Sequence, residues 1–385
     1  MPEICRFDPS GCGFPPPRVP LLPAAGMREL SGSASDRVPP RLLDGRGVRR
    51  FARGRYALHA AFQAAGLGPD TVVLAPSYHC RTMLDPALAL GAGVALYALD
   101  ERLVPDLASI ERLLGASGAG ARALLVTHYF GFEQPAQVMD ALDALCRRHG
   151  LLLVEDCAHA WMVAQRRVAA GCPDARLVVA SPYKYFPCPD GGMLWGDPAS
   201  LPSQGAGAGF MAELKALRQM GLRRDAVLPA PAVAPPGMAR GAEHRAHDDQ
   251  PSHYYDRALE RRDSLQLTRW LVGRARPEAI AAQRRRRYRE WVDVLRCLQH
   301  ARAFQPELPE SCAPYMFPML ISRPDPDFFL LKQAGMPIWR WDDMALSDCG
   351  VASRYRTRLL HLPCHQGLSD AQMDWMTTLA CKVLA

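Results

Sequence analysis

Four side chains that can do chemistry together lie between residues 151 and 195, each close to the end of a short apolar run. The run 151–154 is typical of a strand buried on both faces, and charge appears directly after it. A second apolar run, 177–180, leads into a proline-containing turn, which is followed by a third short run, 193–195. Side chains at the ends of neighbouring strands can converge on one ligand. The four candidates are Asp156, His159, Ser181 and Lys184.

Lys184 stands in an aromatic turn of a chain that otherwise uses arginine. The 46 basic residues include only four lysines, at positions 184, 215, 332 and 382. Arginine stays protonated at accessible pH, whereas a desolvated lysine can lose its proton and attack a carbonyl to form a Schiff base. The alternative is a solvated loop lysine whose stem passes Tyr183 and Tyr185. The neighbouring residues must decide between the two.

Those neighbours resemble the DegT/StrS family of nucleotide-sugar aminotransferases, which use pyridoxal 5′-phosphate (PLP). In that family a buried strand ends in Glu-Asp, with Gln or His three residues beyond the Asp. A later strand carries Ser three residues before the Schiff-base Lys, and Gly-Gly follows. The matching residues here are Glu155-Asp156, His159, Ser181, Lys184 and Gly191-Gly192.

The resemblance implies a role for each matching side chain. Asp156 would pair with the pyridinium nitrogen of PLP, His159 would lie near the ring oxygen, Ser181 would bind the phosphate and Lys184 would hold the aldehyde. A fixed carboxylate at about 4 Å favours a pyridinium proton by roughly 4 kcal/mol at an effective dielectric of 20. Two structural alternatives stand beside these roles, an Asp156 that caps a helix and a His159 that bonds to a neighbouring strand.

A further phosphate contact is expected at Gly54-Arg55, which precede a helix over 56–65. In the resembled family the matching turn gives its backbone amides to the PLP phosphate, and a helix N-terminus suits a dianion. Arg55 replaces the Thr or Ser usual there. The family also often places an aromatic ring on the cofactor from the loop after the next strand, where this chain has Cys80. Tyr78 or His79 could substitute with a register shift.

Strands and helices alternate along most of the chain, which predicts βαβ units and an α/β fold with a mainly parallel sheet flanked by helices, the PLP-dependent transferase fold type I. Residues 1–45 read as an irregular arm, 46–255 as the large PLP-binding domain and 256–385 as a smaller C-terminal α+β domain. The expected strands are 71–76, 94–99, 123–127, 151–154, 177–180, 193–195 and 314–321. The expected helices are 56–65, 83–90, 107–114, 135–149, 212–221, 277–298 and 328–334, with a last one from 369.

One family feature is missing. A Gly-x-Asn-x-Arg segment that reaches the partner subunit's cofactor is expected after the third run, but residues 228–250 carry no such pattern and read as a long loop or mobile lid. His128-Tyr129-Phe130-Gly131 resembles a His-x-x-Gly of the family, in a role that is structural or catalytic. The resemblance implies a homodimer, because related enzymes complete each active site from two chains.

The composition limits the classes of binding partner that are expected. The net charge of +7 comes without basic blocks interleaved with aromatic residues, so nucleic acid is not expected. The basic run Arg284–Arg287 reads as a solvated helix face or one that meets an anionic substrate. The twelve cysteines lack framework or metal spacing, and Cys364-His365 has no flanking ligands, so no metal is expected. The sequence shows no leader pattern and no apolar run long enough to span a bilayer, so it predicts a cytoplasmic protein that does not bind the membrane.

The sequence therefore favours a PLP-dependent aminotransferase that moves an amino group from an amino acid, glutamate by family analogy, to a nucleotide-linked keto-sugar. Two alternatives stay open. One is a PLP enzyme of elimination or dehydration, although Lys184 argues against the dehydratases that carry histidine there. The other is a degenerate, non-catalytic relative that binds a small molecule or partner.

Overall fold

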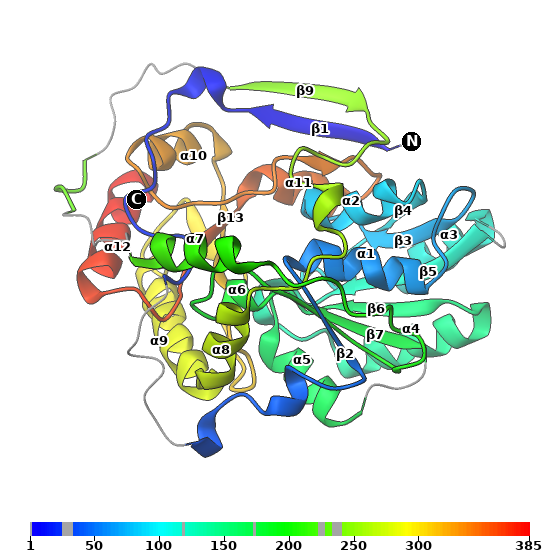
Figure 1. Ribbon diagram of the computed structural model, residues 1–385. Coiled ribbons are helices and arrows are strands. Elements are labelled where there is room, and N and C mark those ends of the chain that lie inside the picture. The colour runs from blue at the N-terminus through cyan, green and yellow to red at the C-terminus, as the bar shows by residue number, and fades with distance from the viewer. Residues whose placement is uncertain (1, 25–33, 118–119, 172–174, 222–227, 233–240) are drawn as a thin grey trace.

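The computed structural model describes residues 2–24, 34–117, 120–171, 175–221, 228–232 and 241–385 (Figure 1). Its centre is a seven-stranded sheet in which β3 to β7 run parallel and β8 runs antiparallel to both its neighbours. A mainly parallel sheet is what the alternation of strands and helices predicts, and the pairing of residues 152–156 with parallel strands on both sides confirms it. The strand order is β2 (Val48–Phe51), β8 (Gly192–Trp195), β7 (Arg176–Ala180), β6 (Leu152–Asp156), β5 (Ala121–Thr127), β3 (Val72–Pro76) and β4 (Gly93–Tyr97).

Both faces of this sheet are buried, which explains why its strands are apolar without alternation. Successive side chains of a strand point to opposite faces: Val73 and Ala75 of β3 pack with the first two helices, whereas Leu74 between them packs with the next two. A third cluster joins the far face of β7 and β8 to later helices. The helices are α1 (Gly54–Ala64), α2 (Arg81–Ala89), α3 (Leu107–Ser117), α4 (Ala136–His149), α5 (Trp161–Ala169), α6 (Pro182–Tyr185), α7 (Phe210–Gly221) and α8 (Gln266–Arg274).

The C-terminal third forms a second core around a small antiparallel sheet, β10 (Ala301–Ala303), β11 (Met316–Ile321) and β13 (Leu359–Pro363). This matches the expected α+β character, whereas the domain boundary after residue 255 stays a prediction. Its helices are α9 (Pro277–Leu295), α10 (Pro324–Gln333), α11 (Gly350–Arg358) and α12 (Asp370–Leu384).

The N-terminal segment is not irregular throughout. Residues 3–8 form β1 (Glu3–Asp8), which pairs with β9 (Ala242–His247) along its whole length and with β12 (Met344–Ala345) on its other edge. The two long strands lie side by side in Figure 1. The expectation of an irregular arm is therefore wrong for 3–8, and that of a loop over 228–250 is wrong for 242–247, because each strand needs a partner far away in sequence. Residues 233–240 of that stretch lie outside the described residues.

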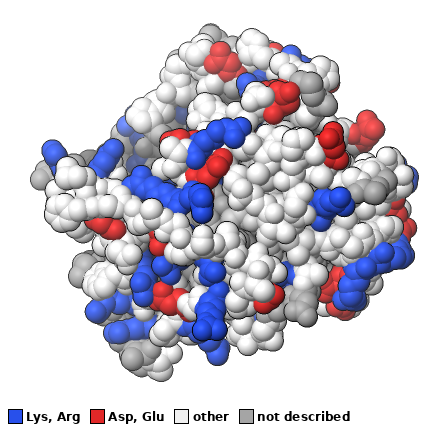
Figure 2. All heavy atoms as spheres, turned by 45° about the vertical axis from the view of Figure 1, so that its right-hand side comes forward, with Lys and Arg blue, Asp and Glu red and all other residues white. Residues whose placement is uncertain are grey.

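Charge is distributed without one dominant sign on the face seen in Figure 2, where Lys and Arg side chains are interspersed with Asp and Glu. The run Arg284–Arg287 does not form the solvated helix face suggested by the sequence. Arg284 is fully buried and Arg287 is 9% exposed, whereas Arg286 faces solvent. Among the described residues, no helix combines the length and apolar character that a bilayer span requires.

Candidate active site

The candidate site lies where several strands of the large sheet end. β5, β6 and β7 end at this edge, and β2, which runs in the same direction as they do, brings the start of α1 to it. A pocket at this edge is lined by every site residue predicted from the sequence. Its lining residues are Arg53, Gly54, Arg55, Leu58, Cys80, Thr82, Met83, Thr127, Asp156, Ala158, His159, Val179, Ser181, Tyr183, Lys184 and Trp341.

Asp156 is the last residue of β6 and is only 3% exposed. Its Oδ1 accepts a hydrogen bond from the Ala158 amide at 2.8 Å. Burial raises the pKa of this carboxyl group, whereas the positive charge of Lys184 and the Ala158 amide act to lower it. Asp156 does not cap the following helix α5, whose N-cap residue is Ala160. A buried carboxylate at the pocket wall is a partner for a positively charged or N–H-bearing ligand.

His159 is buried against aromatic rings. It stacks on Tyr315 at 4.3 Å between ring centroids, and its Nδ1 accepts the Phe130 amide at 3.4 Å. Burial first, and then the charges of Lys184 and His361, hold the pKa of His159 well below its ordinary value. The ring is therefore neutral, and because Nδ1 accepts, Nε2 carries the proton. His159 thus accepts a hydrogen bond from a neighbouring segment and lines the pocket as well, whereas its contact with a cofactor stays a prediction.

Ser181 and the start of α1 are in direct contact. A Cβ placed on Gly54 would lie 2.0 Å from Ser181 Oγ, so only glycine lets the helix begin here. The N-cap residue of α1, Arg53, gives no side-chain cap to the first amides. A helix N-terminus without a cap, beside a serine hydroxyl, is a suitable site for a phosphate group.

Lys184 lies in the short helix α6 and its side chain lines the pocket. Its Nζ is 5.4 Å from the centroid of the Tyr315 ring, and its amide bonds to the Ser181 carbonyl at 3.0 Å. The side chain is half-buried, so it is not the fully solvated lysine of the alternative reading. Tyr185 points away into the core and donates to the Pro277 carbonyl at 2.9 Å.

Two arginines flank Gly54 at the pocket. Arg55 donates to the Tyr254 carbonyl, so part of its guanidinium is engaged by the protein itself. Arg53, which the sequence reasoning did not single out, lies over the Tyr183 ring at 4.5 Å from the ring centroid and donates to the Pro189 carbonyl at 2.9 Å. Two cationic side chains therefore line the pocket on either side of Gly54.

The loop after β3 does not supply an aromatic ring to the pocket. Tyr78 and His79 are fully buried, and Tyr78 bonds to His361 at 2.9 Å, so neither replaces Cys80, which does line the pocket. The aromatic residues that do line the pocket include Tyr183, next to Lys184, and Trp341, between α10 and α11. Trp341 also packs against Tyr78, with ring centroids 4.7 Å apart. No local pattern predicts Trp341 at this position, because it lies more than 250 residues from Cys80 in the chain.

His128 and Glu155 belong to the scaffold. Glu155 is fully buried, and its carboxylate contacts His128 Nε2 at 2.9 Å, Arg167 Nε at 3.2 Å and Arg176 Nη1 at 2.6 Å. Burial would raise the pKa of Glu155, but these partners together hold it at about 2. His128, Glu155 and Cys157 lie close enough to share an ion, yet the carboxylate is already saturated by cations, so the cluster is better explained as an ion-pair network.

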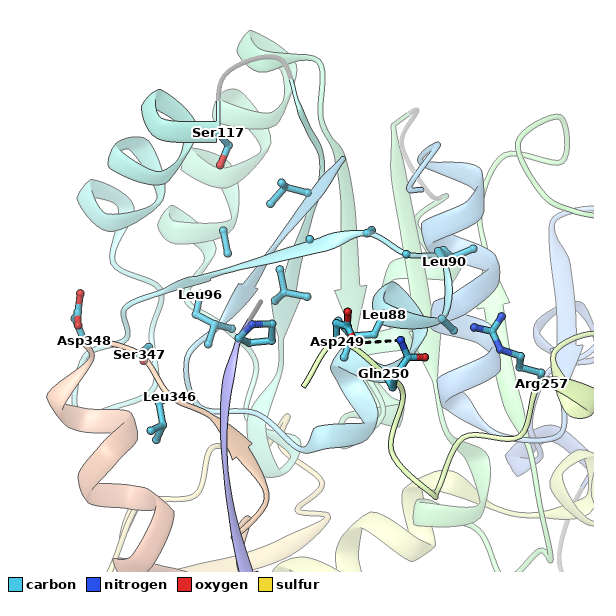
Figure 3. Close-up of a pocket in the computed structure, with 18 residues that line it drawn as sticks. Leu88, Leu90, Leu96, Ser117, Asp249, Gln250, Arg257, Leu346, Ser347 and Asp348 are labelled. Atoms are coloured by element: carbon cyan, nitrogen blue, oxygen red, sulfur yellow. Dashed lines mark hydrogen bonds between the residues drawn. The ribbon is translucent and has the colours of Figure 1, made fainter. Parts of the chain in front are cut away.

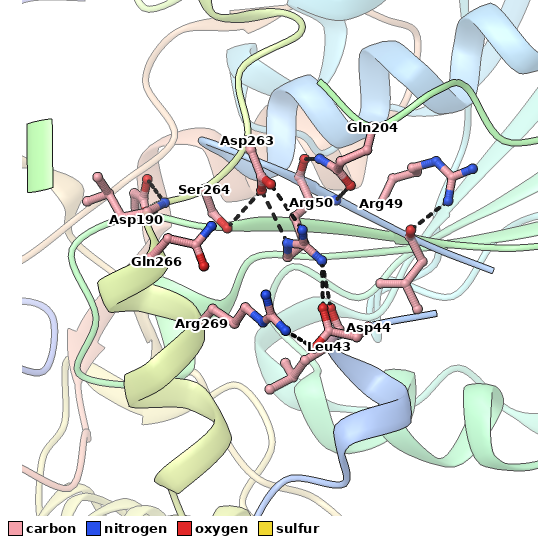
Figure 4. A network of polar contacts seen from close by, with 12 residues as sticks. Leu43, Asp44, Arg49, Arg50, Asp190, Gln204, Asp263, Ser264, Gln266 and Arg269 are labelled. Carbon is pink, nitrogen blue, oxygen red and sulfur yellow. Dashed lines mark hydrogen bonds and ion pairs between the residues drawn. The ribbon is translucent and has the colours of Figure 1, made fainter. Parts of the chain in front are cut away.

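A second network fixes the Asp190-Gly191-Gly192 turn that follows Lys184 (Figure 4). Asp190 accepts from the Leu265 amide at 3.1 Å and from the Thr268 hydroxyl at the start of α8. Nearby, Arg50 of β2 bridges Asp263 at 3.1 Å and Asp44 at 2.9 Å. These bonds join β2, the Gly-Gly turn and α8 into one frame behind the pocket.

A larger cavity of about 950 Å³ lies along the outer edge of β4 (Figure 3). Its wall is mostly leucine, alanine and β4 backbone. Its charged residues are spread out, with Asp348 and Arg257 at opposite ends of the view. No lysine, histidine or cysteine is among its described lining residues. Chemistry rather than size therefore locates the candidate active site.

Comparison with known proteins agrees with this geometry. Residues 50–206, which contain Gly54, Asp156, Ser181 and Lys184, match the model of the DegT/DnrJ/EryC1/StrS aminotransferase family. This part of the chain is similar to that family. The recognition made from the sequence is confirmed, and DegT/DnrJ/EryC1/StrS aminotransferases are PLP-dependent enzymes.

Solved structures share the fold over most of the chain. The aminotransferase TlmJ from Streptoalloteichus hindustanus is 21% identical, with a TM-score of 0.62 over 94% of this chain and 96% of that one. DesV from S. venezuelae is 21% identical, with a TM-score of 0.59 over 90% and 89%. Helicobacter pylori PseC, an aminotransferase of pseudoaminic acid biosynthesis, is 11% identical, with a TM-score of 0.61 over 95% and 99%. These similarities confirm the expected fold class.

Proposed function

We propose that the chain is an aminotransferase that uses PLP to move an amino group from an amino acid, with glutamate the expected donor, to a nucleotide-linked keto-sugar. The observation that carries the proposal is the convergence of Lys184, Asp156 and the Ser181–α1 contact on one pocket. Their chemistry suits the three ends of PLP: an amine for the aldehyde, a carboxylate for the ring nitrogen and an anion site for the phosphate.

Three features of the pocket test whether its residues fit PLP. The absence of a Cβ at Gly54 leaves the α1 amides and Ser181 Oγ side by side, where a phosphate would accept from both. Asp156 is buried with a raised pKa, and a pyridinium N–H⁺ beside it would restore its charged form. The neutral His159, with its proton on Nε2, could donate to a ring oxygen.

When bound, PLP would supply an aldehyde for attachment and an electron-withdrawing ring. The residues of this chain would do the rest. Lys184 would hold the aldehyde through its amine, and the same amine would serve as the group that moves a proton at the donor's α-carbon. Asp156 would hold the ring nitrogen protonated. Trp341, rather than position 80, would cover the ring, and Arg55 would add charge to the phosphate site.

A homodimer in the cytoplasm is part of the proposal. Most of the large apolar side chains that are exposed among the described residues lie on α7, at Phe210, Met211, Leu214 and Leu217, and a second copy of the chain is the expected cover for this row. The described cysteines are free thiols, which supports a reducing compartment. The mixed charge on the face seen in Figure 2 supports small-molecule substrates over nucleic acid.

The reaction type can be tested in a single turnover of PLP-loaded protein. With L-glutamate alone, an aminotransferase releases 2-oxoglutarate, keeps the nitrogen and passes it on when a nucleotide-linked keto-sugar is added. A sugar product that has lost a hydroxyl group as water, without gaining an amino group, would instead favour an elimination or dehydration enzyme. A protein that yields neither the keto acid nor an altered sugar, with the acceptors of this class and with PLP bound, would be a non-catalytic binder.

A further inference from the structure

Arg284 of α9 is buried next to the turn that carries Lys184. Its exposed fraction is 0%, which is unusual for an arginine. Nε donates to Gln366 Oε1 at 2.9 Å, and Nη1 donates to the carbonyls of Pro314 and Tyr315, each at 3.0 Å. Nη2 donates to the carbonyls of Lys184 at 3.1 Å and Tyr185 at 2.9 Å. The guanidinium thus spans two backbone segments that lie far apart in sequence.

One segment carries Lys184, which lines the pocket, and the other packs against His159, which also lines it. Lys184 and Tyr185 end the four-residue helix α6, whose last carbonyls have no partner within so short a helix. Tyr315 carries the ring that stacks on His159 and faces Lys184 Nζ. Gln366 adds a bond to the Tyr185 carbonyl at 3.1 Å. One buried cation therefore fixes the backbone of the amine and that of the aromatic wall beside it.

The shape of the guanidinium matters as much as its charge. Arginine presents five N–H donors in a rigid planar fork, and the five bonds above use each of its three nitrogens. Lysine keeps the charge but offers a compact ammonium with three donors, so it cannot reach both segments in the same geometry. The Arg284 guanidinium also lies over the Tyr185 ring, 4.8 Å from its centroid.

We propose that Arg284 is a positioning residue for Lys184: it holds the Lys184 turn against the Tyr315 segment, so that the amine enters the pocket in one orientation. The proposal rests on the function proposed above only for the task it gives to Lys184. α9 supplies this contact from the C-terminal part of the chain, so that helix sets the position of a group in the large sheet's pocket.

The test is Arg284→Lys, with Arg287→Lys as the matched control. Arg287 lies three residues further along α9 and is also largely buried, but it bonds to Glu290, Asp370 and the Leu368 carbonyl, away from Lys184. The readout is the rate at which an amine-acylating reagent labels Lys184 in folded, cofactor-free protein, followed by mass spectrometry of the peptides. The exposed Lys215 is the internal reference.

Arg284→Lys should raise the labelling rate of Lys184 relative to Lys215 by about tenfold, the change that about 1.4 kcal/mol, on the scale of one charge-assisted hydrogen bond, makes in a local opening equilibrium. Arg287→Lys should leave the ratio unchanged. An unchanged ratio in Arg284→Lys, or an equal rise in both variants, would overturn the proposal. If Arg284→Lys does not fold, Gln366→Ala decides, because it removes both the acceptor of Arg284 Nε and the Gln366 bond to the Tyr185 carbonyl. Loss of both contacts should raise the ratio, and no rise would refute the proposal.

A second readout separates this proposal from the proposed function. PLP is added to wild type and to each variant, and its covalent fixation by borohydride is timed. Slower fixation in Arg284→Lys than in Arg287→Lys is expected. If wild type fixes no PLP at all, the proposed function fails while the labelling ratios still decide the role of Arg284. If wild type fixes PLP and all variants match it in both readouts, the positioning role fails alone.

Discussion

Replacement of Gly54 by alanine tests whether α1 begins against Ser181. The new Cβ would lie 2.0 Å from Ser181 Oγ and 3.3 Å from Ser181 Cβ, and Ser181 is only 4% exposed, so the hydroxyl has little room to leave. Overpacking of this kind costs about 1–3 kcal/mol. Alanine in place of glycine gains up to about 1 kcal/mol within a helix and less at its first residue. The clash should win, with a net loss of about 1–2 kcal/mol.

Gly115→Ala is the matched control, since a Cβ at Gly115 in α3 would meet nothing within 4 Å. It should be neutral or stabilising by up to about 1 kcal/mol. Denaturant unfolding measures the free energy of unfolding of both variants. Equilibrium binding of PLP reports whether the phosphate contact is kept. In the double variant Gly54→Ala/Ser181→Ala, loss of the Ser181 Oγ removes the clash, so the stability should be restored. The affinity for PLP should not be restored. If Gly54→Ala is as harmless as Gly115→Ala, the geometry argued for the phosphate site is wrong.

Other expectations follow from the same structure. Glu155 has a pKa of about 2 in the folded protein against an ordinary 4.5, so its ionised form adds about 3 kcal/mol to the free energy of unfolding above pH 4.5, and this is lost as the pH falls towards 2. In Glu155→Gln, unfolding curves at pH 7 should show a free energy of unfolding lower by about 3 kcal/mol, and the dependence of stability on pH between 4.5 and 2 should flatten. Trp341→Leu should weaken PLP binding several-fold, as one lost aromatic contact does, while Trp339→Leu, at a residue that does not line the pocket, should not; equal affinities would remove Trp341 from the site. Leu214→Glu should convert a dimer to a monomer in sedimentation, and a monomeric wild type would exclude the α7 surface as a dimer contact.

The fold and six of the residues that line the pocket were predictable because their signals are local. Strands and helices that alternate at short spacing predict a parallel sheet. Asp156 and Ser181 could be placed at strand ends because an apolar run is recognisable within a few residues. The Gly-Gly pair after Lys184 could be read in the same way. Because parallel strands end at the same edge of a sheet, residues that follow such strands are predicted to lie together at that edge.

The features missed by the sequence depend on distant partners. β1 exists because it pairs with β9, more than 230 residues later, and no periodicity within residues 3–8 reveals such a partner. Trp341 lines the pocket and Tyr315 stacks on His159 at its wall, although both lie more than 130 residues after Lys184 in the chain. Arg284 sits in a basic run that reads as solvated, and only its bonds to backbone carbonyls show it to be buried. Pairing and burial across long separations are set by tertiary packing, which local patterns do not record.

The central claim is that Lys184 is the amine that binds PLP. The most direct measurement is to incubate the protein with PLP, look for the visible absorption of the lysine-bound cofactor, reduce with borohydride and map the modified peptide. We expect the label on Lys184, its loss in Lys184→Ala without loss of fold, and its partial retention without turnover in Asp156→Ala. A label on Lys215, Lys332 or Lys382, or no label on any lysine, would contradict the assignment of this pocket and the aminotransferase function with it.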